Sequence, residues 1–147
     1  MTPLKSLAPG TGVRHSEFNH SADKPAHFLQ IWLLPSQTNI APGYEQKHFD
    51  AQAKRGQLVL VGSPDGAAGS VTLHANASLR AGLFHGNERA ELALDPSRLA
   101  YVHLVRGSLR VNGQYLQAGD ALTLSQEQRL VLDEGQDSEV LVFDLQA

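Results

Sequence analysis

The sequence predicts an all-β domain made of short antiparallel strands, and three observations support this prediction. Thirteen glycines and seven prolines interrupt the 147-residue chain so often that long helices are not expected. Between these breakers the apolar residues alternate with polar ones or form short blocks, which are the patterns of half-buried and buried strands. In the second half the turn signals recur about every 8–12 residues, a spacing that is typical of an antiparallel sandwich or barrel.

The first two thirds of the chain contain four expected strands. Residues 28–34 form an almost continuous apolar block that stops at Pro35, and they predict a mostly buried strand. Residues 57–61 end before a turn-rich stretch, and residues 70–74 and 90–94 alternate in polarity, so each predicts a further strand.

The last third carries the clearest strand pattern. Residues 99–105 are rich in β-forming side chains and are expected to end at Arg106-Gly107. Residues 108–111 alternate and lead into Asn112-Gly113, a strong hairpin signal because both turn positions need a positive φ. The remaining strands are expected at residues 115–116, 121–124, 129–132 and 139–145.

Residues 42–55 predict a connection with about one helical turn, and they are the candidate linker between residues 1–40 and residues 41–147. The apolar side chains of the expected strands predict the core of residues 41–147. Its expected members are Leu58, Leu60, Val102, Leu104, Leu109, Val111, Leu122, Leu124, Val131, Val140 and Val142.

The composition excludes several classes of protein. There is no cysteine, which excludes a disulfide framework, cysteine-ligated zinc or iron–sulfur clusters and a thiol nucleophile. The formal net charge is −3 and the basic residues are scattered, so no direct nucleic-acid partner is expected. The longest apolar stretch is too short to span a bilayer, and no secretory signal pattern is visible, so we expect a cytoplasmic protein without membrane association.

The best candidate for chemistry is the pair His15 and Glu17. Two residues apart on a strand, their side chains would share one face, and an imidazole nitrogen and a carboxylate oxygen there can share a divalent ion such as iron, manganese, nickel, copper or zinc. The same spacing also occurs by chance on a solvated strand, so both interpretations stay open. No phosphate-binding glycine loop, dinucleotide fingerprint or nucleophile elbow is present, and no catalytic or cofactor-binding residue is assigned.

Three blocks, in order, resemble the pirin family: residues 8–19, 29–35 and 42–49. Within the first block, residues 10–19 look like the second metal motif of a cupin barrel. The resemblance continues through residues 138–145 and covers essentially the whole chain.

Pirins are bicupins, with two jelly-roll barrels in one chain. The resemblance implies a truncated pirin: a cupin-type antiparallel jelly-roll barrel over residues 41–147, with residues 1–40 as an arm of remnant strands from a first barrel. The family's metal site, usually around iron, is built from three histidines and one glutamate, and His15 and Glu17 match the last two of these. No His-x-His occurs in this sequence to supply the other two. The resemblance therefore implies half a site, with iron or another divalent transition metal at partial occupancy, or none.

These expectations lead to three functional hypotheses. The first is a non-catalytic binding or interaction module that lacks a complete metal site. The second is a metal-dependent, quercetin-type dioxygenase whose site is completed across chains. The third is a cupin that binds or isomerises a small sugar or acid inside the second barrel; the ligand itself is unknown. Because residues 28–34 would lack cover, we also expect a homodimer through residues 1–40, formed by strand exchange.

Overall fold

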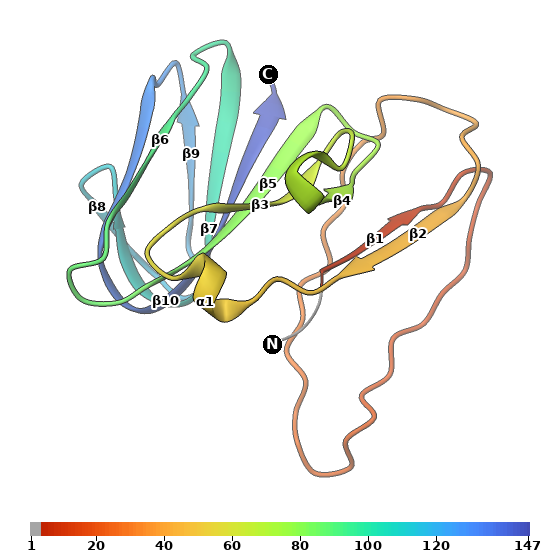
Figure 1. The fold of residues 1–147 in the computed structure, drawn as a ribbon, viewed down its shortest axis with the longest axis horizontal. Coiled ribbons are helices and arrows are strands. Elements are labelled where there is room, and N and C mark those ends of the chain that lie inside the picture. Colours follow the sequence, from red (N-terminus) through yellow and green to blue (C-terminus); the bar gives the residue numbers. More distant parts are fainter. Residues whose placement is uncertain (1–3) are drawn as a thin grey trace.

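The structure is a computed structural model that describes residues 4–147, and it consists almost entirely of β-strands (Figure 1). The elements in chain order are β1 (Leu4–Ala8), β2 (Gly43–Lys47), α1 (Ala51–Lys54), β3 (Val59–Ser63), η1 (Ala67–Gly69), β4 (Val71–Thr72), β5 (Ala77–Phe84), β6 (Ala90–Ala93), β7 (Arg98–Val111), β8 (Gln114–Gln117), β9 (Ala121–Ser125) and β10 (Arg129–Gln146). The all-β prediction is confirmed, and the named strands pair antiparallel except for β3 and β4, which are parallel. The helical turn expected within residues 42–55 is α1.

Strands β7 and β10 are the framework of the barrel, because each pairs with different neighbours along its length. Strand β10 pairs with β6 near its start and with β5 near its end, while β7 pairs first with β9 and then with β8. The two long strands also pair with each other along most of their length. They therefore belong to both walls of the barrel and connect them, as Figure 1 shows.

The expected strand ends at Arg106-Gly107 and near residue 132 are wrong, because β7 and β10 run on through these positions. Gly107 has a φ of +72°, and a Cβ placed on it would lie 2.1 Å from the carbonyl oxygen of Gln136 on β10. The register between the two strands also shifts beside this glycine. Gly107 therefore bends the strand against its partner instead of ending it.

The inner cluster of apolar side chains fills the barrel, and most of the expected core belongs to it. Val102, Leu104, Leu109, Val111, Leu124, Val140 and Val142 are buried, and Leu58 and Leu122 pack against them partly exposed. The prediction for Val131 is wrong: Leu130 and Leu132 on either side of it are fully buried, so this part of β10 has the opposite phase. The prediction for Leu60 is also wrong, since its side chain is only partly buried. Its neighbours Val59 and Val61 belong to a second apolar cluster.

This second, outer cluster covers the opposite face of the sheet formed by β3, β5 and β10. Its buried members are Val61, Leu79, Ala81 and Phe143, and its partly buried members are Leu4, Phe49, Val59, Leu73, Leu141 and Leu145. Strand β10 serves both clusters, since Val140 and Val142 face inward while Leu141 and Phe143 face outward. Leu4 and Phe49 come from the N-terminal part of the chain, which therefore packs on the outside of the barrel.

Strands β1 and β2 form a separate two-stranded antiparallel sheet, called here the N-terminal ribbon. Leu4 lies opposite Lys47 and Ala8 lies opposite Gly43, so the ribbon joins residues on both sides of the expected boundary near residue 40. The intervening residues 9–42, called here the N-terminal segment, form a wide loop that lies largely to the right of the barrel in Figure 1.

The strand expected at residues 28–34 is wrong for the single chain, because these residues form neither a strand nor a helix. No backbone hydrogen bond joins them to another described residue. A strand is stable only when its backbone groups pair with a neighbouring strand. The apolar pattern therefore indicated a suitable sequence, but the described chain offers it no partner.

Candidate functional site

His15 and Glu17 lie in the N-terminal segment, outside any strand, and both side chains are exposed. The carboxylate of Glu17 pairs with the ammonium group of Lys5 on β1, at 3.1 Å from Nζ to Oε2 and 3.4 Å to Oε1. This hydrogen bond and the attraction between the charges raise the pKa of Lys5. A metal ion at Glu17 would have to displace a cation that already neutralises the carboxylate.

The described residues of this chain do not by themselves supply the metal ligands that the resemblance implies. Within residues 4–147 no group of three or more histidine, cysteine, aspartate or glutamate side chains is arranged to hold a metal ion. His15 and Glu17 are two donors on an exposed loop, and Lys5 already holds one of them. Two donors leave most coordination positions to water, which gives weak binding.

The barrel interior leaves little room for a small ligand. The inner cluster is made of leucine, valine, alanine and phenylalanine side chains, and a recess at one barrel end, beside Leu124 and Asp144, measures only about 10 Å³. That volume admits about one water molecule. Arg98 closes the same end by donating to the carboxylate of Asp144 and to Asn76 Oδ1, the latter at 3.0 Å. A larger recess of about 840 Å³ is lined mainly by polar side chains, among them Arg110, Gln128 and Asp133, and none of its lining residues belongs to the inner cluster. The recess beside Leu124 therefore gives the third hypothesis no support.

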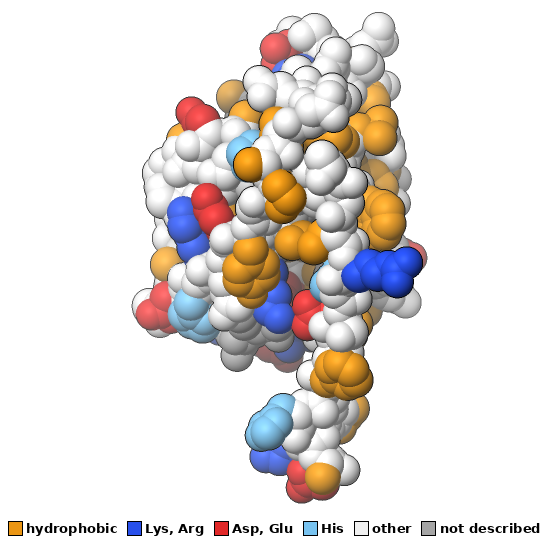
Figure 2. Space-filling model, turned by 90° about the vertical axis from the view of Figure 1, so that its right-hand side faces the viewer, with side chains coloured by type: hydrophobic (Ala, Val, Ile, Leu, Met, Phe, Trp, Pro, Cys, Tyr) orange, Lys and Arg blue, Asp and Glu red, His pale blue; other side chains and the backbone are white. Residues whose placement is uncertain are grey.

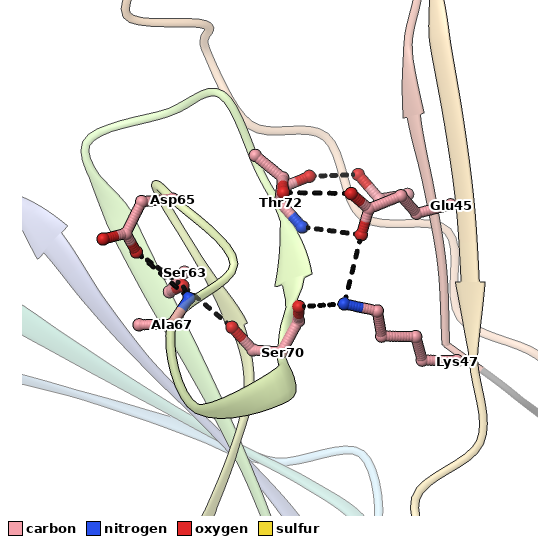
Figure 3. Close-up of polar contacts among 8 residues, drawn as sticks. Glu45, Lys47, Ser63, Asp65, Ala67, Ser70 and Thr72 are labelled. Atoms are coloured by element: carbon pink, nitrogen blue, oxygen red, sulfur yellow. Dashed lines mark hydrogen bonds and ion pairs between the residues drawn. The ribbon is translucent and has the colours of Figure 1, made fainter.

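A polar cluster holds the N-terminal ribbon against the barrel edge at β4 (Figure 3). The backbone N–H and hydroxyl group of Thr72 donate to the Glu45 carboxylate at 3.1 and 3.0 Å. Lys47 Nζ donates to the Ser70 carbonyl oxygen at 2.6 Å, and Ser6 Oγ donates to the Thr72 carbonyl oxygen at 2.7 Å. The bonds from Thr72 stabilise the ionised carboxylate and lower the pKa of Glu45. The ribbon is therefore fixed in place by both strands.

The N-terminal segment exposes an unusual amount of apolar surface. The exposed fractions are 86% for Phe18, 60% for Phe28, 87% for Trp32 and 92% for Leu34, and Leu29 and Ile31 are also exposed. In Figure 2, hydrophobic side chains occur over this face of the molecule and along the part that projects below its body. Large exposed apolar patches of this kind typically mark interaction surfaces.

The fold and the candidate site can now be compared with known proteins. The antiparallel barrel, with its two long strands shared between both walls, defines the chain as a cupin. Residues 60–145 match the family described as the quercetinase C-terminal cupin domain. The chain belongs to the pirin family, as its motifs predicted, and the cupin-type fold is confirmed.

Two similar proteins come from Escherichia coli. The quercetin 2,3-dioxygenase of strain K12 is 37% identical over 95% of this chain, and the match covers 59% of that enzyme. The crystal structure of YhhW has a TM-score of 0.71 and 32% identity, covering 78% of this chain and 47% of that one. A second YhhW structure is a complex with nickel(II), with a TM-score of 0.69 and 31% identity over 76% of this chain and 47% of that one. The chain thus spans less than two thirds of the relatives it matches.

The structure also identifies contacts that the sequence analysis missed. Lys5 and Glu17 are twelve residues apart, and no local pattern signals their ion pair. Phe18 stands directly after the candidate metal pair, and its polar neighbours give no local sign that it belongs to the exposed apolar surface. Glu45 and Lys47 lie in the expected connection, although their alternation with Tyr44 and Gln46 is compatible with a short strand.

Among the described residues, no helix has the length and apolar character of a membrane span.

Proposed function

We propose that this chain is a non-catalytic interaction module of the pirin family, which binds a protein partner through its N-terminal segment. The observation that carries the proposal is the exposure of Phe18, Phe28, Trp32 and Leu34 on one continuous segment. Burying each such side chain is worth roughly 1.5–3 kcal/mol, so covering this segment with a partner is strongly favourable. The polar cluster at Glu45 and Thr72 supports the proposal because it holds the base of the segment against the rigid barrel.

Three features of the site support the proposed absence of catalysis by the single chain. His15 and Glu17 are exposed, Glu17 is paired with Lys5, and no third donor lies with them among the described residues. The barrel interior is filled with apolar side chains. In this proposal the pirin-type barrel therefore serves as a scaffold that presents the N-terminal segment.

The alternative is a metal-dependent dioxygenase of the quercetin type, with its site completed by another chain. It is favoured by the 37% identity to the E. coli quercetin 2,3-dioxygenase, whose match over 95% of this chain extends into the N-terminal segment. His15 and Glu17 are also accessible to donors from outside. If this alternative holds, the partner bound by the segment supplies the missing ligands.

Elemental analysis and an activity assay distinguish the two proposals. The untagged chain would be expressed in medium supplemented with iron and nickel, purified, and assayed for bound metal and for quercetin consumption under oxygen. We expect far less than one metal ion per chain and no turnover. His15→Ala should remove whatever metal is bound, whereas His20→Ala, an exposed histidine of the same segment, should not. Stoichiometric metal with quercetin turnover that is lost in His15→Ala would establish the dioxygenase instead.

A further inference from the structure

We propose that the partner of the N-terminal segment is a second copy of this chain, and that residues 28–34 of the two copies pair as antiparallel strands around a two-fold axis at Ile31. The inference rests on the proposed interaction function and specifies its partner. It starts from the same seven residues that lack a strand partner in the single chain.

The backbone of residues 28–34 is suited to such pairing. The stretch contains no charged residue and is rich in the aromatic and branched side chains that favour strands. Pro25 and Pro35 lie on either side of the stretch. Because proline has no backbone N–H to donate to a neighbouring strand, the two prolines limit how far the paired strand can extend. Because its N–H and C=O groups make no bonds to other described backbone groups, they are available to a second chain.

Residues 28–34 follow a local turn and are attached to the barrel at their C-terminal end. On one side, a turn is closed by Asn19, whose Nδ2 donates to the Lys24 carbonyl oxygen at 2.6 Å. On the other side, the backbone N–H of Ser36 donates to the His74 carbonyl oxygen at 2.9 Å, which ties the segment to the barrel. The bond to His74 restricts the stretch at its C-terminal end, so pairing costs less conformational entropy than it would for a segment that is free at both ends.

A two-fold axis through Ile31 places like faces together without opposing like charges. Phe28 of one copy lies opposite Leu34 of the other, and Gln30 lies opposite Trp32. Trp32 is then the diagonal neighbour of Phe28 in the other copy, within reach of an aromatic contact. In a two-fold pair the same surface of each copy covers that of the other, so the assembly ends at the dimer.

The exposed apolar area is large enough for a stable dimer. With about 150–250 Å² for each large side chain, the exposed side chains of the stretch present on the order of 600 Å² per chain at their observed fractions. These side chains are Phe28, Leu29, Ile31, Trp32 and Leu34. If the pair covered all of this surface, the two chains would together bury about 1,200 Å², the lower limit of a stable protein–protein interface.

Trp32 is the only tryptophan, so its fluorescence reports directly on this contact. Light scattering and emission spectra would be recorded on the 147-residue chain over a dilution series. We expect a mass near twice 15.9 kDa at micromolar concentration, with a blue-shifted emission that moves to the red on dilution as the mass falls. Leu34→Asp should give a monomer with red-shifted emission at all these concentrations, because a charge would be buried in the pair. Gln114→Asp, an exposed residue of β8, adds the same charge elsewhere and should remain a dimer.

Three results would overturn the inference: a monomeric wild-type chain, a dimer whose Trp32 emission stays red-shifted, or open-ended aggregates in place of a closed dimer. The dilution series of the wild-type chain decides this even if Leu34→Asp does not fold. A metal-free monomer would refute only the second copy as partner. Stoichiometric metal with quercetin turnover would refute the proposed function itself, so the two failures are distinguishable.

Discussion

At the scale of single residues, Glu45 connects the N-terminal ribbon to the barrel. Its carboxylate accepts two hydrogen bonds from Thr72 and lies 3.5 Å from Lys47 Nζ. These contacts favour the ionised carboxylate and lower its pKa from the usual 4.5. The charged form is therefore part of the folded structure, although the side chain is partly exposed.

The sign of the pH dependence follows from this lowered pKa. Because the folded chain binds a proton at Glu45 less tightly than the unfolded chain, its contribution is complete above about pH 4.5 and is lost as the pH falls through the folded pKa. The Glu45→Gln variant should therefore have a lower melting temperature than the wild type at pH 7. On acidification from about pH 5 to about pH 3, the variant should lose less stability than the wild type. Thermal unfolding at several pH values measures both. Glu127→Gln changes an exposed glutamate away from the ribbon and is the control. Equal pH profiles for the wild type and Glu45→Gln would refute the prediction.

At the scale of elements, β10 shows how one strand can serve two apolar clusters. Its alternation directs Val140 and Val142 into the barrel and Leu141 and Phe143 to the outer cluster. Near its start, Leu130 and Leu132 are the inward residues, while Val131 lies opposite Glu91 on the other face. A strand with apolar residues on both faces does not reveal its phase from its sequence.

The phase of β10 can be tested by comparing neighbouring substitutions. Leu132→Ala should lower the free energy of unfolding by about 2–5 kcal/mol, because Leu132 is fully buried and the change leaves a cavity. Val131→Ala should cost about 1 kcal/mol or less, since its side chain is only partly buried and the surrounding solvent can fill the space. Urea unfolding measures both values. Equal losses would show that Val131 is a core residue after all.

At the scale of the whole molecule, the barrel and the N-terminal segment are nearly separate parts. Residues 9–42 leave the ribbon after Ala8 and return at Gly43, and these two residues are paired partners. The segment is tied to the rest mainly by the Ser36–His74 hydrogen bonds and the Lys5–Glu17 ion pair. An exposed ion pair adds little stability. The fold should therefore not depend on the segment.

Replacing residues 9–42 by an Asn-Gly turn should preserve the barrel. Such a turn closes an antiparallel hairpin directly between Ala8 and Gly43. Shortening the loop lowers the entropic cost of closing it by about 2 kcal/mol. This gain offsets the roughly 1–2 kcal/mol lost with the two hydrogen bonds from Ser36 to the His74 carbonyl oxygen. We expect an unchanged far-UV circular dichroism spectrum, a similar melting temperature and reduced binding of an apolar dye. A chain that no longer folds would show that the segment is part of the barrel's core.

Much of the fold was readable from local pattern. The hairpin at Asn112-Gly113 was predicted from its two residues and joins β7 to β8 as expected. Alternation identified most strands of the last third and seven of the buried core residues, because inward and outward positions differ there in polarity. Strand β5 was missed, since Arg80 and Gly82 interrupt its apolar pattern and its buried residues serve both clusters.

The sequence by itself determined the strand-rich class, the family and the presence of an apolar block at residues 28–34, because these depend on residue types and their local spacing. Only the tertiary structure decided what those residues contact. The spacing of His15 and Glu17 was compatible with a shared metal, but spacing does not fix orientation, and Glu17 pairs with Lys5 instead. Residues 28–34 have the composition of a strand, but a strand needs a neighbour, and whether one exists depends on the whole assembly rather than on local sequence.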